Sequence, residues 1–415
     1  MRIEFKMPSA KDAKERNSRK DRRRVLQFQG DDGTPPARPE HNDLVKALLA
    51  WFQDNKRPLP WRETYAPYEV WISEIMLQQT RMDRAAAYFE RWMQRFPTVQ
   101  SVADAHPDAV LKAWEGLGYY SRVRNLHKAA GIIAREHGGK IPGAMSALRA
   151  LPGIGEYTAG AVLSIAFNQP YPAVDANVER VFARLFDVGH PVKSAAASGF
   201  IRHMAQALIP EGRARDFNQA LMELGALICG KTARCESCPV ATYCQAKHLG
   251  IPHERPVPGK KTGYSALSIV TGVLACNGRI FLQKRLDSGV WAGFWEFPGG
   301  RVERNEAPRE AVAREFFEET EFRVRVIREL GLVRHSYTRY KIAMHCFVLA
   351  LKTGIDSLPL GNDGYPLPHL NAATQYRWVL PEELDAFTFP AGHRKLIDAW
   401  LPELRRICLE SFTQS

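Results

Sequence analysis

Residues 151–160 read Leu-Pro-Gly-Ile-Gly-Glu-Tyr-Thr-Ala-Gly, and this stretch decides the fold of the first half of the chain. Pro152, Gly153 and Gly155 predict a tight hairpin, because glycine enters left-handed backbone conformations at little cost. A helix of small residues is expected over 158–166, and the unpaired amides of its first turn suit a phosphate.

Asp175 stands just before a second expected helix, over 177–186. Taken alone, Asp175 is best interpreted as an N-cap, and the glycines as an ordinary turn between helices. Together, the hairpin and the aspartate resemble the helix-hairpin-helix DNA glycosylases. That resemblance implies that Asp175 lies in an active site and that the hairpin grips DNA, through Leu151, Pro152, Gly153, Ile154 and Gly155.

Length and charge indicate the number of domains and the kind of partner. With 415 residues it should hold two or three domains, each able to bury a core. A net charge of +12 and a pI near 9.4 favour a polyanionic partner such as nucleic acid. No apolar run approaches the roughly 18 residues that span a bilayer, and no signal-peptide core is evident. A cytoplasmic, nucleoid-associated location without membrane contact is expected.

Composition predicts four segments along the chain. Residues 1–40 are rich in lysine and arginine and predict a disordered basic arm. Residues 41–249 carry apolar residues at helical spacing. Residues 250–264, with several prolines and glycines, predict a linker, and residues 265–415 change to strand-like alternation. The fold class is therefore an all-α domain followed by an α+β domain.

Glu74 is the candidate acid of the helical half. It lies on an expected helix over 68–80, where Glu74 and Gln78 share a face, although a lone glutamate on a helix is usually solvated. Four stretches around it resemble the MutY-type adenine DNA glycosylases, namely 59–62, 73–80, 116–126 and 217–229.

That resemblance implies cleavage of the N-glycosidic bond of adenine mispaired with 8-oxoguanine, or less readily with guanine, in double-stranded DNA. Such chemistry needs a leaving group to be protonated and an oxocarbenium ion to be stabilised. By resemblance, Glu74 protonates the flipped adenine. Asp175 then either stabilises the sugar cation or attacks it, and the sequence leaves both routes open. We expect a monomer.

Further positions match the family's base pocket or the wedge that enters the duplex. Gln78 and Tyr119 are the wedge candidates, since planar side chains can replace base stacking, and core packing is the alternative for Tyr119. The pocket and wedge set is Arg62, Leu77, Gln78, Gln79, Tyr119, Tyr157, Asn177 and Gln219. Endonuclease III-like pyrimidine glycosylase/lyases resemble this domain but carry a lysine near Tyr157, so strong lyase activity is not expected.

Four cysteines are spaced Cys229-x5-Cys235-x2-Cys238-x5-Cys244. Four thiolates at such spacing can hold zinc or a [4Fe–4S] cluster, and spacing alone does not decide between them. Their position after the glycosylase core, where the family carries its iron–sulfur cluster, implies [4Fe–4S]. The first gap is one residue shorter than is usual in the family.

The last segment resembles the Nudix fold. Strands are expected over 268–276 and 279–284, around the hairpin dipeptide Asn277-Gly278, and further strands over 322–334, 341–351 and 375–379. Helices are expected over 307–320 and 392–400.

In MutY-type proteins this domain recognises 8-oxoguanine. The matching loop, 335–339, supplies Tyr337, Thr338 and Arg339. The Nudix box is nearly complete, with Glu321 where the pattern has glycine, and Glu315, Glu318 and Glu319 predict a Mg²⁺ site on one helix face. A solvated acidic face is the alternative, and a second activity on oxidised nucleoside triphosphates stays open. A non-catalytic DNA-binding module is disfavoured because Glu74 and Asp175 are both present.

Overall fold

The protein, described by a computed structural model, is defined over residues 39–259, 263–337 and 339–412. It divides into two compact units, residues 1–93 with 135–260 and residues 94–134 with 261–415. The second unit thus includes residues 94–134, a division that the sequence pattern did not indicate. The predicted basic arm lies almost wholly outside the described residues, and the predicted domain boundaries stay predictions. Among the described helices, none combines the length and apolarity needed to cross a bilayer.

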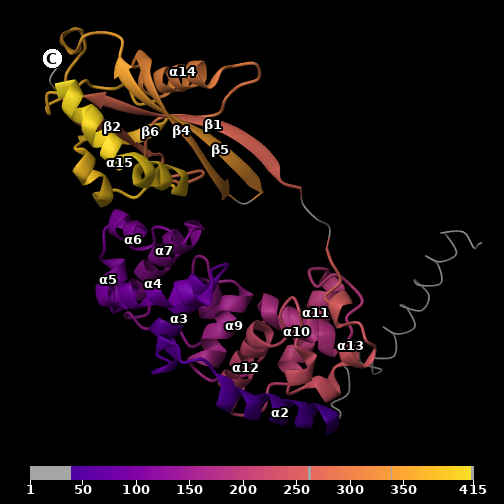
Figure 1. Cartoon of the computed structure of the whole chain (residues 1–415). Coiled ribbons are helices and arrows are strands. Elements are labelled where there is room, and N and C mark those ends of the chain that lie inside the picture. The colour runs from indigo at the N-terminus through magenta and orange to yellow at the C-terminus, as the bar shows by residue number, and fades with distance from the viewer. Residues whose placement is uncertain (1–38, 260–262, 338, 413–415) are drawn as a thin grey trace, which may run out of the picture. The chain divides into compact units, whose positions relative to one another are not determined.

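The first unit is built from helices, as the sequence predicts (Figure 1). Its helices are α2 (Pro39–Asn55), α3 (Pro67–Leu77), most of α4 (Met82–Arg95), α8 (Met145–Arg149), α9 (Glu156–Ile165), α10 (Ala176–Leu185), α11 (Ala195–Ala207), α12 (Ala214–Leu227) and α13 (Gln245–His248). Buried residues of α2, α10, α11 and α12 form one apolar core. A smaller cluster joins α3 to α9 through Val70, Ala161 and Ile165.

The turn between α8 and α9 is the predicted hairpin, with one correction. Gly153 has a positive φ of 77° and needs to be glycine, whereas Gly155 is extended, with φ −86° and ψ −178°. An extended residue is what an N-cap requires, so Gly155 starts α9 at Glu156 and not at Thr158 as expected. From Thr158 to Ile165 every residue of α9 is buried. The small side chains therefore serve close helix packing.

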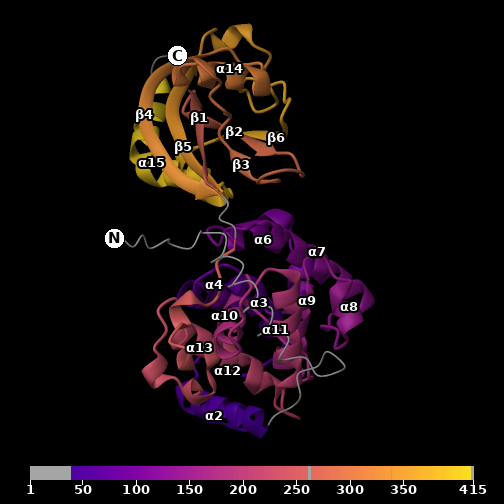
Figure 2. The same ribbon diagram turned by 90° about the vertical axis from the view of Figure 1, so that its right-hand side faces the viewer.

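Asp175 is the N-cap of α10, as predicted, and its side chain accepts a hydrogen bond from the Val178 amide. Neighbouring α12 approaches α10 closely at Gly225, where an added Cβ would stand 2.5 Å from the Cβ of Asn177. Gly225 therefore fixes Asn177 beside Asp175. Helices α10 and α12 thus lie side by side, although α11 separates them in the sequence (Figure 2).

In the second unit, residues 94–134 contribute three helices, and the remainder forms a mixed sheet with two further helices. The elements are α5 (Val99–Ala103), α6 (Pro107–Ala113), α7 (Ser121–Glu136, ending just outside the unit), β1 (Ser265–Cys276), β2 (Arg279–Arg285), β3 (Trp295–Glu296), α14 (Pro308–Thr320), β4 (Val324–Tyr337), β5 (Tyr340–Leu351), β6 (Ala373–Val379) and α15 (Ala391–Phe412). The strand order is β3-β2-β1-β5-β4, with β6 on β2. Strands β1 and β5 run parallel, and the other pairs are antiparallel.

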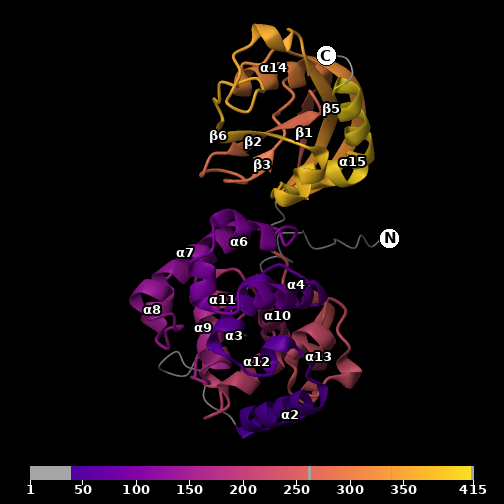
Figure 3. The same ribbon diagram turned by 90° about the vertical axis from the view of Figure 1, so that its left-hand side faces the viewer.

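Alternating residues of β1 face two separate cores, one under each helix. Val273 and Ala275 belong to the cluster that contains Leu396 and Ile397 of α15. Leu274 and Cys276 belong to the cluster that contains α14 residues. Since successive strand residues point to opposite faces, α14 and α15 cover opposite sides of the sheet (Figure 3).

The predicted hairpin at Asn277-Gly278 is confirmed, with φ values of 42° and 77° that match a two-residue turn. One strand was missed and one expected loop was wrong. The two-residue strand β3 was not predicted, because so short an element carries no alternation. The expected loop over 335–339 is largely strand, since His335, Ser336 and Tyr337 pair with β5.

Candidate functional site

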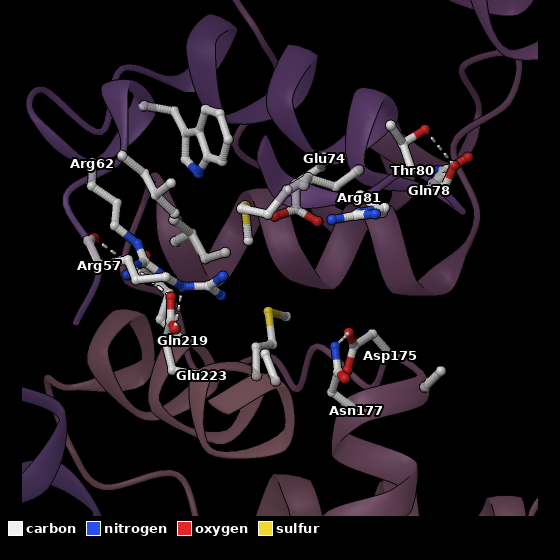
Figure 4. Close-up of a pocket in the computed structure, with 18 of the residues that line it drawn as sticks. Arg57, Arg62, Glu74, Gln78, Thr80, Arg81, Asp175, Asn177, Gln219 and Glu223 are labelled. Carbon is white, nitrogen blue, oxygen red and sulfur yellow. Dashed lines mark hydrogen bonds and ion pairs between the residues drawn. The ribbon is translucent and has the colours of Figure 1, made fainter. Parts of the chain in front are cut away.

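The first unit holds a cavity of about 880 Å³ that lies between α3, α9, α10 and α12. Glu74 enters it from α3 and Asp175 from the N-terminus of α10 (Figure 4). All of the predicted pocket residues except Tyr119 line this cavity, namely Arg62, Leu77, Gln78, Gln79, Tyr157, Asn177 and Gln219. The structure therefore brings together residues that are more than 150 positions apart in the sequence.

Glu74 is buried, with 4% of its surface exposed. Its Oε2 accepts a hydrogen bond of 2.7 Å from the Tyr157 hydroxyl, which comes from the first turn of α9. Burial raises the pKa of Glu74 to about 7, and the nearby Asp175 adds to the rise, while Tyr157 and Arg62 oppose it. At neutral pH this carboxyl group is therefore present in both protonated and ionised forms, which suits general acid catalysis.

Asp175 is held in place by hydrogen bonds from its own helix. Its Oδ1 accepts from the Val178 amide at 2.8 Å, and its Oδ2 accepts from the Asn177 side-chain amide at 2.7 Å. Burial raises the pKa of Asp175, while these hydrogen bonds and the charge of Arg180 act in the other direction. The two carboxyl groups thus differ in their surroundings: Glu74 has one hydroxyl donor, and Asp175 has two amides and a nearby cation.

One side of the cavity is a buried ion-pair cluster. Both Arg57 and Arg62 pair with Glu223, at 2.8 and 2.7 Å, and the Glu223 side chain is 1% exposed. Arg62 also donates to Oε1 of Gln219 at 2.8 Å. This cluster fixes the direction of the Gln219 amide, so the cavity presents defined donors and acceptors instead of mobile ones.

The two wedge candidates differ in exposure. Gln78 is half-buried, and its amide donates to the Thr158 hydroxyl at 3.2 Å. Next to it, Gln79 is exposed and has a positive φ of 57°. Tyr119 belongs to the second unit and is 43% exposed, so the alternative of core packing is wrong for this residue.

The four cysteines Cys229, Cys235, Cys238 and Cys244 line one small cavity and form no disulfide bonds with one another. Arg184 closes one side of this cavity. It donates to the carbonyl oxygens of Cys229, Gly230 and Lys231, and its Nη1 lies 3.2 Å from Sγ of Cys229. Within the described ranges, no three His, Cys, Asp or Glu side chains are grouped as ligands of a single metal ion.

A chain of hydrogen bonds joins the cysteine cavity to Asp175. Arg180 donates from Nε to the Cys229 carbonyl at 2.7 Å and from Nη2 to Oδ1 of Asn177 at 2.7 Å. Asn177 in turn donates to Asp175. The orientation of the aspartate therefore depends on the backbone at Cys229.

The three acidic residues of α14 divide into two environments. Glu315 and Glu318 both pair with Arg314 at 3.1 Å. Glu319 has other partners, because it accepts from the Gly299 amide at 3.1 Å and from Gln283 at 2.8 Å. Burial, followed by the charge of Glu296, raises the pKa of Glu319 to about 8. Glu321 ends α14 in the left-handed conformation, which explains why the pattern has glycine there.

Tyr337 and Arg339, two of the predicted lesion-reading residues, lie at the β4–β5 turn. Tyr337 packs against Trp291, with ring centroids 5.1 Å apart. Arg339 is exposed and donates to the Tyr340 hydroxyl at 3.2 Å. Thr338 lies outside the described residues.

Sequence reasoning missed Arg57, Glu223, Arg180 and Arg184. The sequence could have indicated Glu223, because it follows Gln219 by four positions and so shares its helix face. Arg180 and Arg184 have the same spacing on α10. Arg57 carried no such pattern, since its partner lies 166 residues away.

Comparison with known proteins identifies two domain families in the chain. Residues 72–198 match the HhH-GPD superfamily base excision DNA repair proteins, and residues 270–399 match the NUDIX domain. These matches confirm the predicted order of a helix-hairpin-helix domain and a Nudix-like domain.

Among solved structures, a thermostable thymine-DNA glycosylase shares 26% identity over 51% of this chain and 97% of its own, with a TM-score of 0.47. A MutT protein from Methanosarcina mazei Go1 shares 24% identity over 34% of this chain and 98% of its own, with a TM-score of 0.29.

Two relatives show to which family the chain belongs. An adenine DNA glycosylase of Mycobacterium tuberculosis is 42% identical over 52% of this chain and 72% of the relative. The adenine DNA glycosylase of Homo sapiens is 32% identical over 88% of this chain and 75% of the relative. The two carboxyl groups thus lie in the cavity of a chain that belongs to the adenine DNA glycosylase family.

Proposed function

We propose that the protein excises adenine mispaired with 8-oxoguanine, or less readily with guanine, from double-stranded DNA. The observation that carries this proposal is the pairing of Glu74, with a pKa near 7, and the hydrogen-bonded Asp175 in one cavity. The names of the relatives support the choice of adenine. A base inside a duplex must be flipped out to reach such a cavity.

Glu74 acts as the general acid. Because the Tyr157 hydroxyl donates to Oε2, that oxygen is occupied as an acceptor, and Oε1 is left to carry the acidic proton. Proton transfer to the adenine ring, at N7, makes the base a neutral leaving group. Once ionised, Glu74 can orient the water that attacks the sugar.

Asp175 faces the sugar, where positive charge develops as the glycosidic bond breaks. Donors from Val178 and Asn177 keep its two oxygens fixed, so its negative charge is oriented before the reaction starts. Both routes, a transient covalent bond to the sugar and purely electrostatic stabilisation, use this same carboxylate.

The remaining assignments concern the DNA. Arg62 and Gln219, held by Glu223, offer a donor and an amide to the edge of the base. Leu77, Gln79 and Asn177 complete the pocket, and the hairpin 151–155 places the first-turn amides of α9 for a phosphate. Tyr119 and Gln78 fill the gap that the flipped base leaves. The protein acts on DNA as a monomer.

The excision rate is expected to show a maximum between two limits of pH. It falls as pH rises through about 7, because Glu74 loses its proton. It also falls at low pH, where Asp175 becomes protonated, and this limit lies above 3.8 because burial raises the pKa. Single-turnover rates at saturating protein, measured from pH 4.5 to 9, check this. A rate that keeps rising above pH 8 would contradict the role of Glu74.

The cysteine cavity fits a [4Fe–4S] cluster. Its four thiols surround one space, and Arg184 offsets the negative charge of thiolates. When bound, such a cluster crosslinks the segment 229–244 and thereby holds the Cys229 carbonyl that Arg180 contacts.

Purified protein is therefore expected to be brown, with about four irons for each chain, as four-thiolate ligation of one cluster requires. Cys235→Ala should lose iron, whereas Cys408→Ala, which removes a buried thiol outside the cavity, should retain it. Iron and zinc are measured after anaerobic purification. Stoichiometric zinc with negligible iron would overturn the assignment.

For the Nudix-like domain we propose recognition of the 8-oxoguanine opposite the adenine, through Tyr337, Thr338 and Arg339. One observation favours a second activity. Glu296 is buried and Glu319 is half-buried, and desolvation raises the pKa of both carboxyl groups. A divalent cation held by Glu315, Glu318 and Glu319 would favour the ionised form of Glu319. A Mg²⁺ ion held there would neutralise the charge of a diphosphate and activate water.

Full-length protein is accordingly expected to release pyrophosphate from 8-oxo-dGTP in a Mg²⁺-dependent manner. Glu319→Gln should lower this rate by about 10²-fold or more while leaving adenine excision unchanged. Pyrophosphate release and Mg²⁺ binding by calorimetry are the measurements. If neither is detected, the acidic face serves only the stability of a DNA-reading domain.

A further inference from the structure

In the loop between α6 and α7, one aromatic residue is exposed to solvent while its apolar neighbours are buried. Trp114, Leu117 and Tyr120 are buried, with exposed fractions of 0, 6 and 7%, whereas Tyr119 is 43% exposed. Gly118 has a φ of 72° and Tyr119 a φ of 48°, so two successive residues lie in the left-handed region. A non-glycine residue keeps this conformation only where its surroundings enforce it.

Arg122, in the first turn of α7, supplies much of that enforcement. Its Nη2 donates to the carbonyl oxygens of Leu117 and Gly118, at 3.2 and 3.0 Å, and its Nε donates to the carbonyl of Tyr119 at 3.4 Å. One guanidinium group thus contacts three consecutive carbonyls of the loop. The indole of Trp114 adds a donor of its own to Gly118, at 3.2 Å.

The same guanidinium also touches two rings. Its carbon lies 5.2 Å from the ring centre of Trp114 and 5.6 Å from that of Tyr119. A cation at this distance from an aromatic ring is attracted to it. Arg122 therefore links the buried Trp114 to the exposed Tyr119 and holds both the backbone and the ring of the latter.

We infer that Arg122 is a positioning residue that holds Tyr119 in the outward conformation in which it enters the duplex. The inference rests on the proposed function, in which Tyr119 is the wedge. Inserting a mobile side chain on a loop with two glycines would require that loop to be ordered during the step. A loop already fixed by Arg122 avoids this entropic cost. Lysine cannot replace it, since a single ammonium lacks the planar fork and the stacking surface.

The test measures insertion apart from chemistry. A duplex carries 2′-fluoro-2′-deoxyadenosine, which resists excision, opposite 8-oxoguanine, with a fluorescent 2-aminopurine next to the adenine to report unstacking. Stopped-flow fluorescence gives the rate of unstacking, and anisotropy gives the affinity for the duplex. The proteins are full-length wild type, Arg122→Ala, Arg122→Lys, Tyr119→Ala and the double variant. Arg135→Ala is the matched control, because Arg135 is an exposed arginine on the same helix.

Arg122→Ala and Arg122→Lys are each expected to slow unstacking about tenfold with affinity changed less than about threefold, since loop order is lost but charge contacts are not. In the Tyr119→Ala background, Arg122→Ala should have no further effect, because it acts through the tyrosine. Circular dichroism and iron content matching the wild type show that the variants fold.

Three outcomes would overturn parts of the account. Wild-type unstacking by Arg122→Lys would mean that Arg122 contributes only charge, and additive losses in the double variant would mean that it acts independently of Tyr119. Either result rejects the inference alone. Wild-type unstacking by Tyr119→Ala would instead reject the wedge assignment within the proposed function.

Discussion

Glu74→Gln is expected to excise adenine about 10²–10⁴-fold more slowly than the wild type, with affinity for the lesion duplex nearly unchanged. Glutamine keeps the shape of the side chain and can accept the hydrogen bond from Tyr157, but it carries no acidic proton. Single-turnover excision from an A:8-oxoguanine duplex gives the rate, and anisotropy gives the affinity.

Glu69→Gln provides the control for this prediction. Glu69 lies on the same helix but outside the cavity, where it accepts from the Thr64 hydroxyl. We expect wild-type excision from it. Excision by Glu74→Gln at the wild-type rate would show that another group supplies the proton, and the assignment of Glu74 would fail.

Glu223→Ala is expected to lower the free energy of unfolding by about 3 kcal/mol, because it leaves two partly buried arginines without their buried anion. Glu223 is 1% exposed and pairs with both Arg57 and Arg62. Excision should fall as well, since Gln219 loses the cluster that orients it. Urea denaturation followed by circular dichroism measures the stability.

Asp83→Ala is the matched control for Glu223→Ala. It also removes a carboxylate paired with an arginine, but the Arg81–Asp83 pair is exposed, with side-chain exposed fractions of 87 and 71%. Such a pair contributes about 0–1 kcal/mol. If Glu223→Ala were as stable as Asp83→Ala, the ion-pair cluster would not stabilise the fold around the cavity.

Local patterns in the sequence predicted the parts of the fold that depend on local chemistry. The Asn277-Gly278 turn is there because those two residues accept positive φ, and Asp175 caps α10 because its short carboxylate reaches the Val178 amide. The predictions were wrong where pairing with residues distant in the sequence determines the secondary structure. His335 and Tyr337 were expected in a loop, yet partners on β5 extend the strand to Tyr337.

The candidate site shows the same limit. Resemblance placed Glu74 and Asp175 in one cavity, and the structure confirms that both line it. The resemblance did not indicate the pairing of Arg57 with Glu223, because nothing in the sequence near position 57 points to a partner on α12. Nor did it give the path from Asp175 through Asn177 and Arg180 to Cys229, which depends on how α10 and α12 pack.

The central claim is that this protein removes adenine opposite 8-oxoguanine, and one measurement tests it most directly. Full-length protein is incubated with a labelled duplex that contains a single A:8-oxoguanine pair, and alkali then cleaves the strand at any abasic site. The account predicts cleavage at the adenine that depends on alkali, less at an A:G pair, and none at a C:8-oxoguanine pair. An intact adenine strand after prolonged incubation with iron-replete protein, or equal cleavage at all three pairs, would contradict it.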